Sequence, residues 1–199
     1  MRTEPISELF SAVVQVVIFT LIPFIVWLIT ARKKESFFSW IGLKKIHSDK
    51  KKCLKTAVIA FLICEIAGQI VTRTILKADW NQSAGAGMGI KGLPSAIIFS
   101  YIHTAFSEEI LYRGFIQKRL QSFLDFKTAT IIQAFIFGLS HVVLTFNQLT
   151  LLQGIGLLLY PMIPGILIAY TNEKTADGSI LPGWLIHGTL NIITHASQL

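Results

Sequence analysis

Two adjacent carboxylates, Glu108 and Glu109, lie within an apolar stretch of the chain, and Arg113 follows four residues after the second. An ionised side chain at membrane depth is costly, so it persists only where it faces a protein interior or a wet cavity and has a partner. On a helix, Glu109 and Arg113 share one face, whereas Glu108 points about 100° away and is freer to meet another segment. This doublet is the strongest indication of chemistry in the sequence.

Two histidines and an asparagine in other apolar segments are candidates to meet the doublet. His141 follows Phe137 by four residues, and Asn191 follows His187 by the same interval. At about 1.5 Å of rise per residue, Glu108, His141 and His187 lie about 15, 21 and 15 Å from the polar ends of their segments. These depths are near the middle of a hydrocarbon core roughly 30 Å thick, so we expect the side chains to converge.

Such a set of side chains could hydrolyse an amide without a covalent intermediate. A carboxylate with an imidazole can take a proton from water and pass it to the leaving amine. A second imidazole and a carboxamide can donate hydrogen bonds to the oxyanion that forms. The HExxH zinc motif is absent, although carboxylate and histidine side chains could still bind zinc. We therefore expect no cofactor and keep zinc as the alternative.

The composition indicates an integral membrane protein. Of the 199 residues, 52% are hydrophobic and only 15% are charged, against about 25% in a typical soluble domain. Residues 9–31 carry no charged side chain, and about 20 apolar residues suffice to cross a bilayer as a helix. The segment lacks the basic start and small-residue cleavage site of a secretory signal, so we interpret it as a retained span.

The expected fold class is all-α: a polytopic bundle of about six transmembrane helices, with short interfacial helices. The approximate spans are 9–31, 56–72, 94–119, 128–146, 149–170 and 180 to near the C-terminus. Polar residues interrupt the third and sixth apolar runs. Residues 36–46 mix aromatic and lysine side chains, which predicts a segment at the cytoplasmic headgroup level. Residues 79–91 are polar and glycine-rich, which predicts an extracytoplasmic loop.

The basic residues predict the topology of the chain. The net charge is +7, but nine of the 18 Lys and Arg residues lie within 32–55, directly after the first span. This clustering is typical of a cytoplasmic loop that also contacts lipid headgroups, and it argues against a nucleic-acid partner. Alternating spans with the N-terminus outside place 13 basic residues in inner loops and four in outer segments, so both termini are expected outside.

The chain shows no boundary between soluble and membrane regions. We expect one membrane domain, in which residues 1–93 form N-terminal spans and the basic loop and residues 94–199 form the catalytic core. The two cysteines, Cys53 and Cys64, suit neither a disulfide framework nor a metal cluster. The expected location is a multi-pass protein of a bacterial plasma membrane.

Three motifs in order resemble those of the CPBP intramembrane proteases, the family of CAAX proteases and bacteriocin-processing (Abi) proteins. EExxxR matches residues 108–113, FxxxH matches 137–141 and HxxxN matches 187–191. The resemblance covers about residues 94–195 and implies a glutamic intramembrane endopeptidase. It also implies that Glu109 with Arg113 braces the site.

The resemblance implies direct roles for four further side chains. Glu108 and His141 would activate the water. His187 and Asn191 would hold the oxyanion. The substrate would be a peptide or protein, with lipidated C-termini and leader peptides as options.

Other functions share some of these features. A non-catalytic immunity or scaffold protein of the same family would keep the polar network, and a small transporter could use the carboxylates as a proton relay. A rhomboid-like serine protease would need Ser140 with His187 as its base, because Ser140 and His141 point about 100° apart. That alternative leaves the doublet unexplained, and an aspartyl protease is disfavoured because all four aspartates fall in loops.

The remaining polar residues at membrane depth have structural interpretations. Glu65 is expected to line the cavity or to bond to a neighbour in a structural or gating role. His103 lies off the face of Glu108 and is expected to be structural. His195, near the outer end, is expected to be interfacial, and Tyr112 shares the face of Glu108 and is a candidate substrate contact.

Overall fold

The computed structural model of the protein describes residues 4–76, 84–145, 147 and 149–196. Within these ranges the chain forms helices and turns and no β-strand, which confirms the all-α prediction. Residues 79–83 of the predicted outer loop lie outside the described residues. The rest of that loop forms turns with positive φ at Gly85 and Gly87, followed by the 3-10 helix η3 (Gly89–Gly92).

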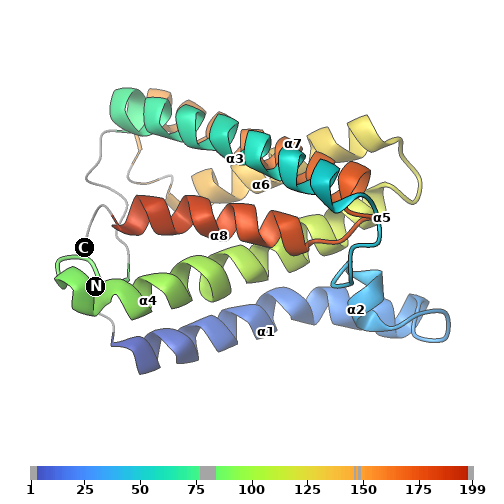
Figure 1. Ribbon diagram of the computed structural model, residues 1–199. Coiled ribbons are helices and arrows are strands. Elements are labelled where there is room, and N and C mark those ends of the chain that lie inside the picture. The colour runs from blue at the N-terminus through green and yellow to red at the C-terminus, as the bar shows by residue number, and fades with distance from the viewer. Residues whose placement is uncertain (1–3, 77–83, 146, 148, 197–199) are drawn as a thin grey trace.

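Six helical rods form the bundle (Figure 1). They are α1 (Pro5–Thr30), α3 (Lys50–Val71) with its π-helical extension η1 (Thr72–Leu76), a rod that begins with α4 (Leu93–Ile97), α6 (Phe126–Thr145), α7 (Leu151–Thr175) and α8 (Leu181–Ala196). Each rod overlaps one of the six predicted segments. The α4 rod lies between α1 and α8, and α3 and α7 pack together beyond α8 (Figure 1).

Four of these rods are long and apolar enough to cross a membrane, namely α1, α3 with η1, α6 and α7. In the most apolar 18-residue stretch of α1, only 11% of the residues are buried inside the bundle, and in the corresponding stretches of α6 and α7 the share is 33%. Exposed apolar surface on this scale needs a lipid environment, so the protein is an integral membrane protein. The 16-residue α8 is about 24 Å long and the α4 rod carries charges, so the total of six spans stays a prediction.

The α4 rod runs without a break over residues 93–120 and contains two π-helical stretches. In order, it consists of α4, η4 (Ile98–Phe106), a link of two residues, η5 (Glu109–Gln117) and α5 (Lys118–Leu120). Glu108 ends the link and Glu109 begins η5. Wide π turns are rare in helices and are frequent at functional sites, because they change which side chains share a face.

Small residues bring α6 and α7 into close contact beside the second motif. A Cβ atom at Gly138 would lie 2.2 Å from the carbonyl oxygen of Leu158, so only glycine fits there. A Cβ atom at Gly165 would lie 2.9 Å from the Ala134 Cβ. This close approach is typical of helices packed in membranes, and it fixes the part of α6 that carries Phe137.

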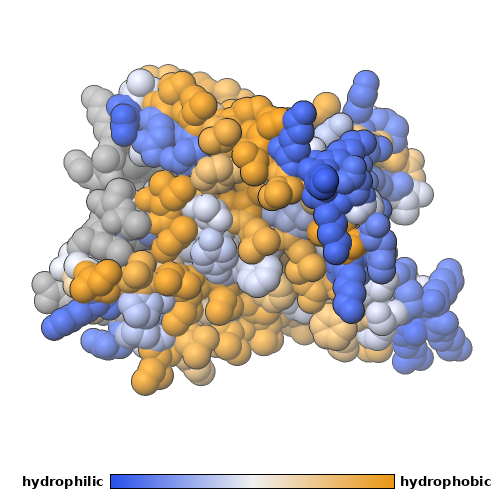
Figure 2. All heavy atoms as spheres, viewed as in Figure 1, coloured by the Kyte–Doolittle hydropathy of each residue, from blue (hydrophilic) through white to orange (hydrophobic). Residues whose placement is uncertain are grey.

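One end of the bundle carries α2 (Phe37–Trp40) and α5 and holds residues 32–55, 118–127 and 174–180; we call it the basic end (Figure 1). Figure 2 shows hydrophilic side chains gathered there and hydrophobic side chains over most of the helix lengths. The segment 36–46 was predicted to lie at the headgroup level. Phe38 is exposed, but Trp40 and Ile41 are buried in a cluster with residues of α1 and η5, so the segment packs into the bundle.

Polar contacts close the basic end. The Lys118 Nζ donates hydrogen bonds to the Glu173 Oε1 at 2.6 Å and to the Gly178 carbonyl at 2.7 Å. The Ile180 N–H donates to the Gly42 carbonyl at 2.9 Å. These contacts join α5, the end of α7, the start of α8 and the segment after α2.

Asp177, in the loop between α7 and α8, ties that loop to the basic segment. Its carboxylate accepts hydrogen bonds from the backbone N–H groups of His47 and Ser48 at 2.8 and 2.7 Å. Bonds to the charged form hold the pKa of Asp177 below its ordinary value. The tie is therefore complete at neutral pH and is lost as the pH falls through that lowered pKa.

Candidate active site

Glu108 and Glu109 leave the α4 rod in different directions. Glu109 is fully buried in the bundle. Glu108 lies on the wall of a cavity, with 17% of its side chain exposed. Adjacent residues on a helix point about 100° apart, and here one carboxylate faces the interior and the other the cavity.

Glu109 lies between a cation and an imidazole. Its Oε1 is 3.1 Å from the Arg113 Nη1 and 3.2 Å from the His187 Nδ1. The Arg113 guanidinium is 1% exposed and lies 4.2 Å from the centre of the Phe137 ring. None of the guanidinium nitrogens meets the geometry of a hydrogen bond to the described residues, so the contact between Arg113 and Glu109 is an ion pair without a well-aligned hydrogen bond. The predicted Glu109–Arg113 pair is present.

Glu108 meets a different helix, as its position on the rod predicts. Its Oε2 is 3.6 Å from the His187 Nε2. That separation is longer than a hydrogen bond, and polar groups at such a distance are commonly bridged by water. His187 thus stands between the two carboxylates of the doublet, with Nδ1 toward Glu109 and Nε2 toward Glu108.

His141 is oriented by its own helix. Its Nδ1 lies 2.8 Å from the Phe137 carbonyl oxygen. A carbonyl can only accept, so Nδ1 carries a hydrogen and the neutral ring has its lone pair on Nε2. Because His141 also lines the cavity, that nitrogen is the one available to accept a proton there.

Phe137 packs among the polar motifs and is only 2% exposed. Its ring centre lies 4.8 Å from that of His141 and 5.9 Å from that of His187, both edge to face. With Arg113 over its face, the ring touches all three motifs. This explains why an aromatic side chain is useful four residues before the histidine.

Asn191 is held by a residue that the sequence analysis did not single out. Its Nδ2 donates a hydrogen bond to the Thr104 Oγ1 at 2.8 Å. The Thr104 hydroxyl lies 3.0 Å from the Phe99 carbonyl and 3.2 Å from the Ser100 carbonyl. Thr104 is four residues before Glu108, and that interval was the available signal.

A cavity of about 730 Å³ brings the motif side chains together. Its wall includes Glu108, His141, His187 and Asn191, from three rods. Glu109 and Arg113 lie behind the wall and do not line it. A cavity of this size is typical of a ligand site, and it holds the convergent polar groups that mark the candidate site.

Other polar residues fall into place around the cavity. Glu65 lines it and accepts a hydrogen bond from the Gln69 Nε2 at 2.8 Å. His195 was predicted to be interfacial; instead it is 5% exposed and lines the cavity, because it continues the face of Asn191 by another four residues. Tyr112 is buried against Phe137 and is not on the wall, so the substrate-contact prediction is wrong for this structure.

Ser140 does not suit the rhomboid-like alternative. Its hydroxyl donates a hydrogen bond to the Phe137 carbonyl at 2.7 Å, within its own helix. It is also not among the side chains that line the cavity. The seryl nucleophile that this alternative requires is therefore not presented to His187.

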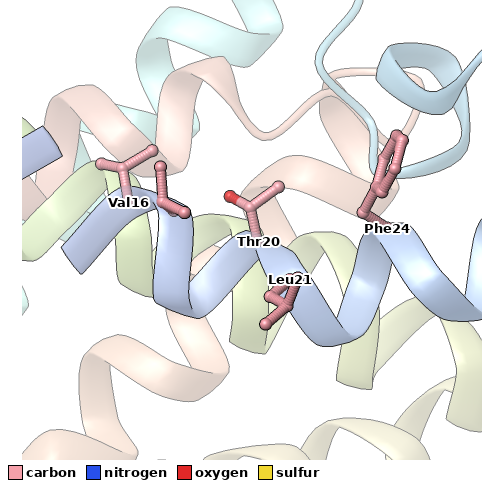
Figure 3. A pocket seen from close by; sticks show the side chains of 5 residues that line it. Val16, Thr20, Leu21 and Phe24 are labelled. Carbon is pink, nitrogen blue, oxygen red and sulfur yellow. The ribbon is translucent and has the colours of Figure 1, made fainter. Parts of the chain in front are cut away.

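A second hollow lies on α1 and contains no ionisable group (Figure 3). It has a volume of about 250 Å³ and is lined by Val16, Val17, Thr20, Leu21 and Phe24. Its apolar wall suits contact with lipid acyl chains and offers no acid or base.

A second pair of carboxylate and imidazole lies between α1 and η4, in which Glu8 is buried and His103 is partly buried. The Glu8 Oε1 is 2.5 Å from the His103 Nδ1, and the Gln15 Oε1 is 3.0 Å from the His103 Nε2. Gln15 also donates to the His103 carbonyl at 3.0 Å. His103 was predicted to be structural, and it has partners on both nitrogens. Glu8 was missed because it precedes the uncharged run.

Among the described residues, no group of three His, Cys, Asp or Glu side chains is arranged to hold a metal ion. Glu108 and Glu109 each contact the imidazole of His187, one at each ring nitrogen, and the three side chains do not surround a common point where a metal ion could bind. The zinc alternative therefore has no ready set of ligands in the described part of the chain.

Comparison with known families identifies the chain. Residues 90–193, more than half of the chain, match the Rce1-like family, described as type II CAAX prenyl endopeptidase Rce1-like. The chain therefore belongs to this family of membrane proteases. The match contains all three motifs. No curated protein and no solved structure matches the chain.

Proposed function

We propose that this member of the Rce1-like family is an active intramembrane endopeptidase that hydrolyses peptide bonds with a water molecule activated by Glu108 and His141. The observation that carries the proposal is that Glu108, His141, His187 and Asn191 line one cavity, although they come from three separate rods. Acid, base and hydrogen-bond donors around one cavity are what amide hydrolysis needs.

Glu108 and His141 take the water proton in the proposed reaction. The His141 Nδ1–H is bound to the Phe137 carbonyl, so its Nε2 faces the cavity as an acceptor. The water oxygen attacks the peptide carbonyl carbon and forms a tetrahedral oxyanion. The proton then passes to the leaving nitrogen as the carbon–nitrogen bond breaks, which yields a carboxylic acid and an amine.

Asn191 and His187 donate hydrogen bonds to the oxyanion. Asn191 uses one Nδ2 hydrogen for Thr104, and its second hydrogen is available. For His187 the reaction requires a proton on Nε2 when the oxyanion forms, because Nδ1 faces Glu109. Glu109 with Arg113 positions His187 from behind the cavity wall. Hydrogen-bond donors held in place around a forming oxyanion typically make the largest contribution to catalysis.

The proposed substrate is a peptide or protein segment, and the proposed location is a bacterial plasma membrane. Lipidated C-termini and leader peptides are the candidate classes. The leading alternative is a non-catalytic immunity or scaffold protein of the same family, in which the polar network only holds the helices. A proton-relay transporter is the third candidate.

A Glu108→Gln variant tests the proposal. Glutamine keeps the shape and most hydrogen bonds but removes the base, so cleavage of a quenched-fluorescent peptide pool by purified protein should fall by about 10²- to 10⁴-fold. Glu35→Gln, the same change at an exposed site, is the matched control and should keep full activity. Cleavage that persists in Glu108→Gln excludes the mechanism, and pH-driven solute flux that the variant abolishes supports the transporter.

The same assay with a strong chelator tests the role of a metal. Activity that survives the chelator supports water activation by protein side chains alone. Activity that is lost with chelator and restored by zinc supports the metal alternative.

A further inference from the structure

Asn172, in the last turn of α7, is a fully buried amide that contacts the start of α8. Its Oδ1 accepts a hydrogen bond from the Gly183 N–H at 2.9 Å. Gly183 is the third residue of α8, and the first backbone N–H groups of a helix have no partner within that helix. Asn172 does not line the cavity, so any role in the reaction has to pass through another side chain.

The bond to Gly183 assigns the two ends of the Asn172 amide, because only Oδ1 can accept from an N–H group. The other end, Nδ2, is a buried donor without a hydrogen-bond partner among the described residues. The Glu109 Oε2 is a buried acceptor that has none among them either. Leaving such groups unsatisfied in the interior costs free energy, most of all for a charged carboxylate, so each is expected to find a partner.

The two atoms meet beside Gly183. A Cβ atom at this position would lie 2.6 Å from the Asn172 Nδ2 and 2.7 Å from the Glu109 Oε2. Both atoms are therefore within hydrogen-bonding distance of one point, and a small rotation of either side chain or one water molecule joins them. Glycine lowers the stability of a helix relative to alanine, and this close approach gives a reason for glycine here.

Glu109 connects this contact to the candidate site. Its other oxygen, Oε1, lies 3.2 Å from the His187 Nδ1 and 3.1 Å from the Arg113 Nη1. Gly183 and His187 are four residues apart, so they share one face of α8. Asn172, Glu109 and His187 thus form a ring of contacts that is closed by the backbone of α8. Such a ring leaves the Glu109 carboxylate little freedom to turn away from His187.

We propose that Asn172 is a positioning residue for the reaction, which holds the Glu109 carboxylate by its Oε2 so that Oε1 stays directed at Arg113 and His187. The inference rests on the proposed peptidase function, in which the His187 Nε2 donates to the oxyanion while Nδ1 faces Glu109. A carboxylate held in place keeps that donor aligned before the reaction begins. Asn172 lies outside the three motifs, so their spacing gives no indication of this role.

Asn172→Leu tests the role by removing the amide while keeping a side chain of similar size. kcat for the peptide pool should fall about tenfold or more with KM nearly unchanged, because the donor is misaligned while the cavity wall stays intact. Gln117→Leu is the matched control, since it removes another fully buried amide, eight residues after Glu109 on the same rod. It should keep full kcat even where it destabilises the protein as much. A kcat for Asn172→Leu equal to that of this control would overturn the proposal.

Gly183→Ala tests the same contact without changing Asn172. The added methyl group occupies the point between Nδ2 and Oε2, so kcat should fall about tenfold. Gly154→Ala, in α7, adds a methyl group where no described atom outside its own helix backbone lies within 4 Å, and it should keep full activity. Equal activity of the two alanine variants would contradict the proposal.

A double-mutant cycle with Glu109→Gln decides whether Asn172 acts through Glu109. Glutamine removes the carboxylate that Asn172 is proposed to hold, so Asn172→Leu should lower kcat by less than about threefold in that background. A loss as large as in the unchanged protein would overturn the proposal, because Asn172 would then act through α8 or the fold alone.

Denaturant unfolding of the four proteins of this cycle separates the inference from the peptidase function, because it needs no substrate. The stability lost through Asn172→Leu should be at most about half as large in Glu109→Gln as in the unchanged protein. The reason is that the bond to Gly183 is lost in both backgrounds and the contact with a carboxylate in only one. Equal losses overturn the inference. No cleavage by the unchanged protein above that of Glu108→Gln contradicts the peptidase function, while the unfolding cycle still decides whether Asn172 holds Glu109.

Discussion

The bundle contains two pairs of a buried glutamate and a histidine, and they differ in what surrounds them. Glu8 and His103 join α1 to η4, and Glu109 and His187 join η5 to α8. His103 has a partner on each nitrogen, the second being Gln15 at 3.0 Å. The His187 Nε2 instead faces Glu108 across 3.6 Å, on the wall of the cavity.

The difference teaches that contact between a buried carboxylate and an imidazole does not by itself make a candidate site. In the α1 pair every polar group of the ring is satisfied within the helix interface, so the pair acts as a fastener between helices. In the η5 pair one nitrogen remains for solvent or substrate, and a second carboxylate, a second imidazole and a carboxamide share the same space. A ring nitrogen that faces a cavity, as in His187, distinguishes the candidate site from the pair that only joins two helices.

The largest expected difference between the two regions concerns the histidines. His187→Ala should lower kcat for the peptide pool by about 10²- to 10⁴-fold, because in the proposed mechanism His187 donates a hydrogen bond to the oxyanion. His103→Ala, the matched change in the other pair, should leave kcat unchanged. An equal loss of kcat in both variants, measured with purified protein of verified folding, would contradict the distinction between the two pairs.

Arg113→Met tests the buried charge behind the site. It leaves the Glu109 carboxylate without its counter-charge and should lower the free energy of unfolding by about 3–5 kcal/mol. The exposed Arg73→Met should change it by less than about 0.5 kcal/mol. Denaturant unfolding in detergent micelles measures both. Adding Glu109→Gln to Arg113→Met should recover part of the loss, and no recovery would show that the two side chains are not energetically coupled.

Asn191→Ala should lower kcat by about 10²- to 10³-fold with little change in KM, because in the proposed mechanism the lost hydrogen bond forms to the oxyanion and not to the ground-state peptide. Thr104→Val removes only the partner that positions Asn191 and should cause a smaller loss. A rise in KM with unchanged kcat in Asn191→Ala would instead place Asn191 in substrate binding.

Glu8→Gln has the smallest expected effect. It weakens the contact to His103 and should lower the free energy of unfolding by about 1–3 kcal/mol, with kcat unchanged. Measuring both stability and kcat sharpens the comparison with Glu108→Gln, which should lower kcat and leave the free energy of unfolding nearly unchanged. A loss of activity in Glu8→Gln without a loss of stability would mean that α1 takes part in the reaction.

Much of the architecture followed from the sequence because lipid restricts what a chain can do. A segment in the hydrocarbon core must satisfy its own backbone, so long apolar runs predict helices with few alternatives. The ends were less predictable. α3 begins at Lys50 and not near residue 56, because Asp49 caps it and accepts bonds from the N–H groups of Lys51 and Lys52, outside the apolar run.

The members of the candidate site were also predictable, but their surroundings were not. The interval of four residues correctly paired Glu109 with Arg113, and the position of Glu108 correctly predicted a partner on another helix. Two features depend on how separate helices pack together: the contact of Asn191 with Thr104 and the burial of His195. The spacing of residues within one helix predicts such packing only weakly.

The residue types and their intervals alone predicted an all-α membrane bundle, which the structure confirms, and singled out six polar side chains as a candidate site, because charge is costly to bury in lipid. Only the tertiary structure decided which histidine stands between two carboxylates, which histidine has both ring nitrogens bonded within a helix interface, and which motif side chains line the cavity. Those outcomes depend on packing between segments far apart in the chain, as between Gln15 and Ser107, which are 92 residues apart, and such contacts leave no periodic pattern in the sequence.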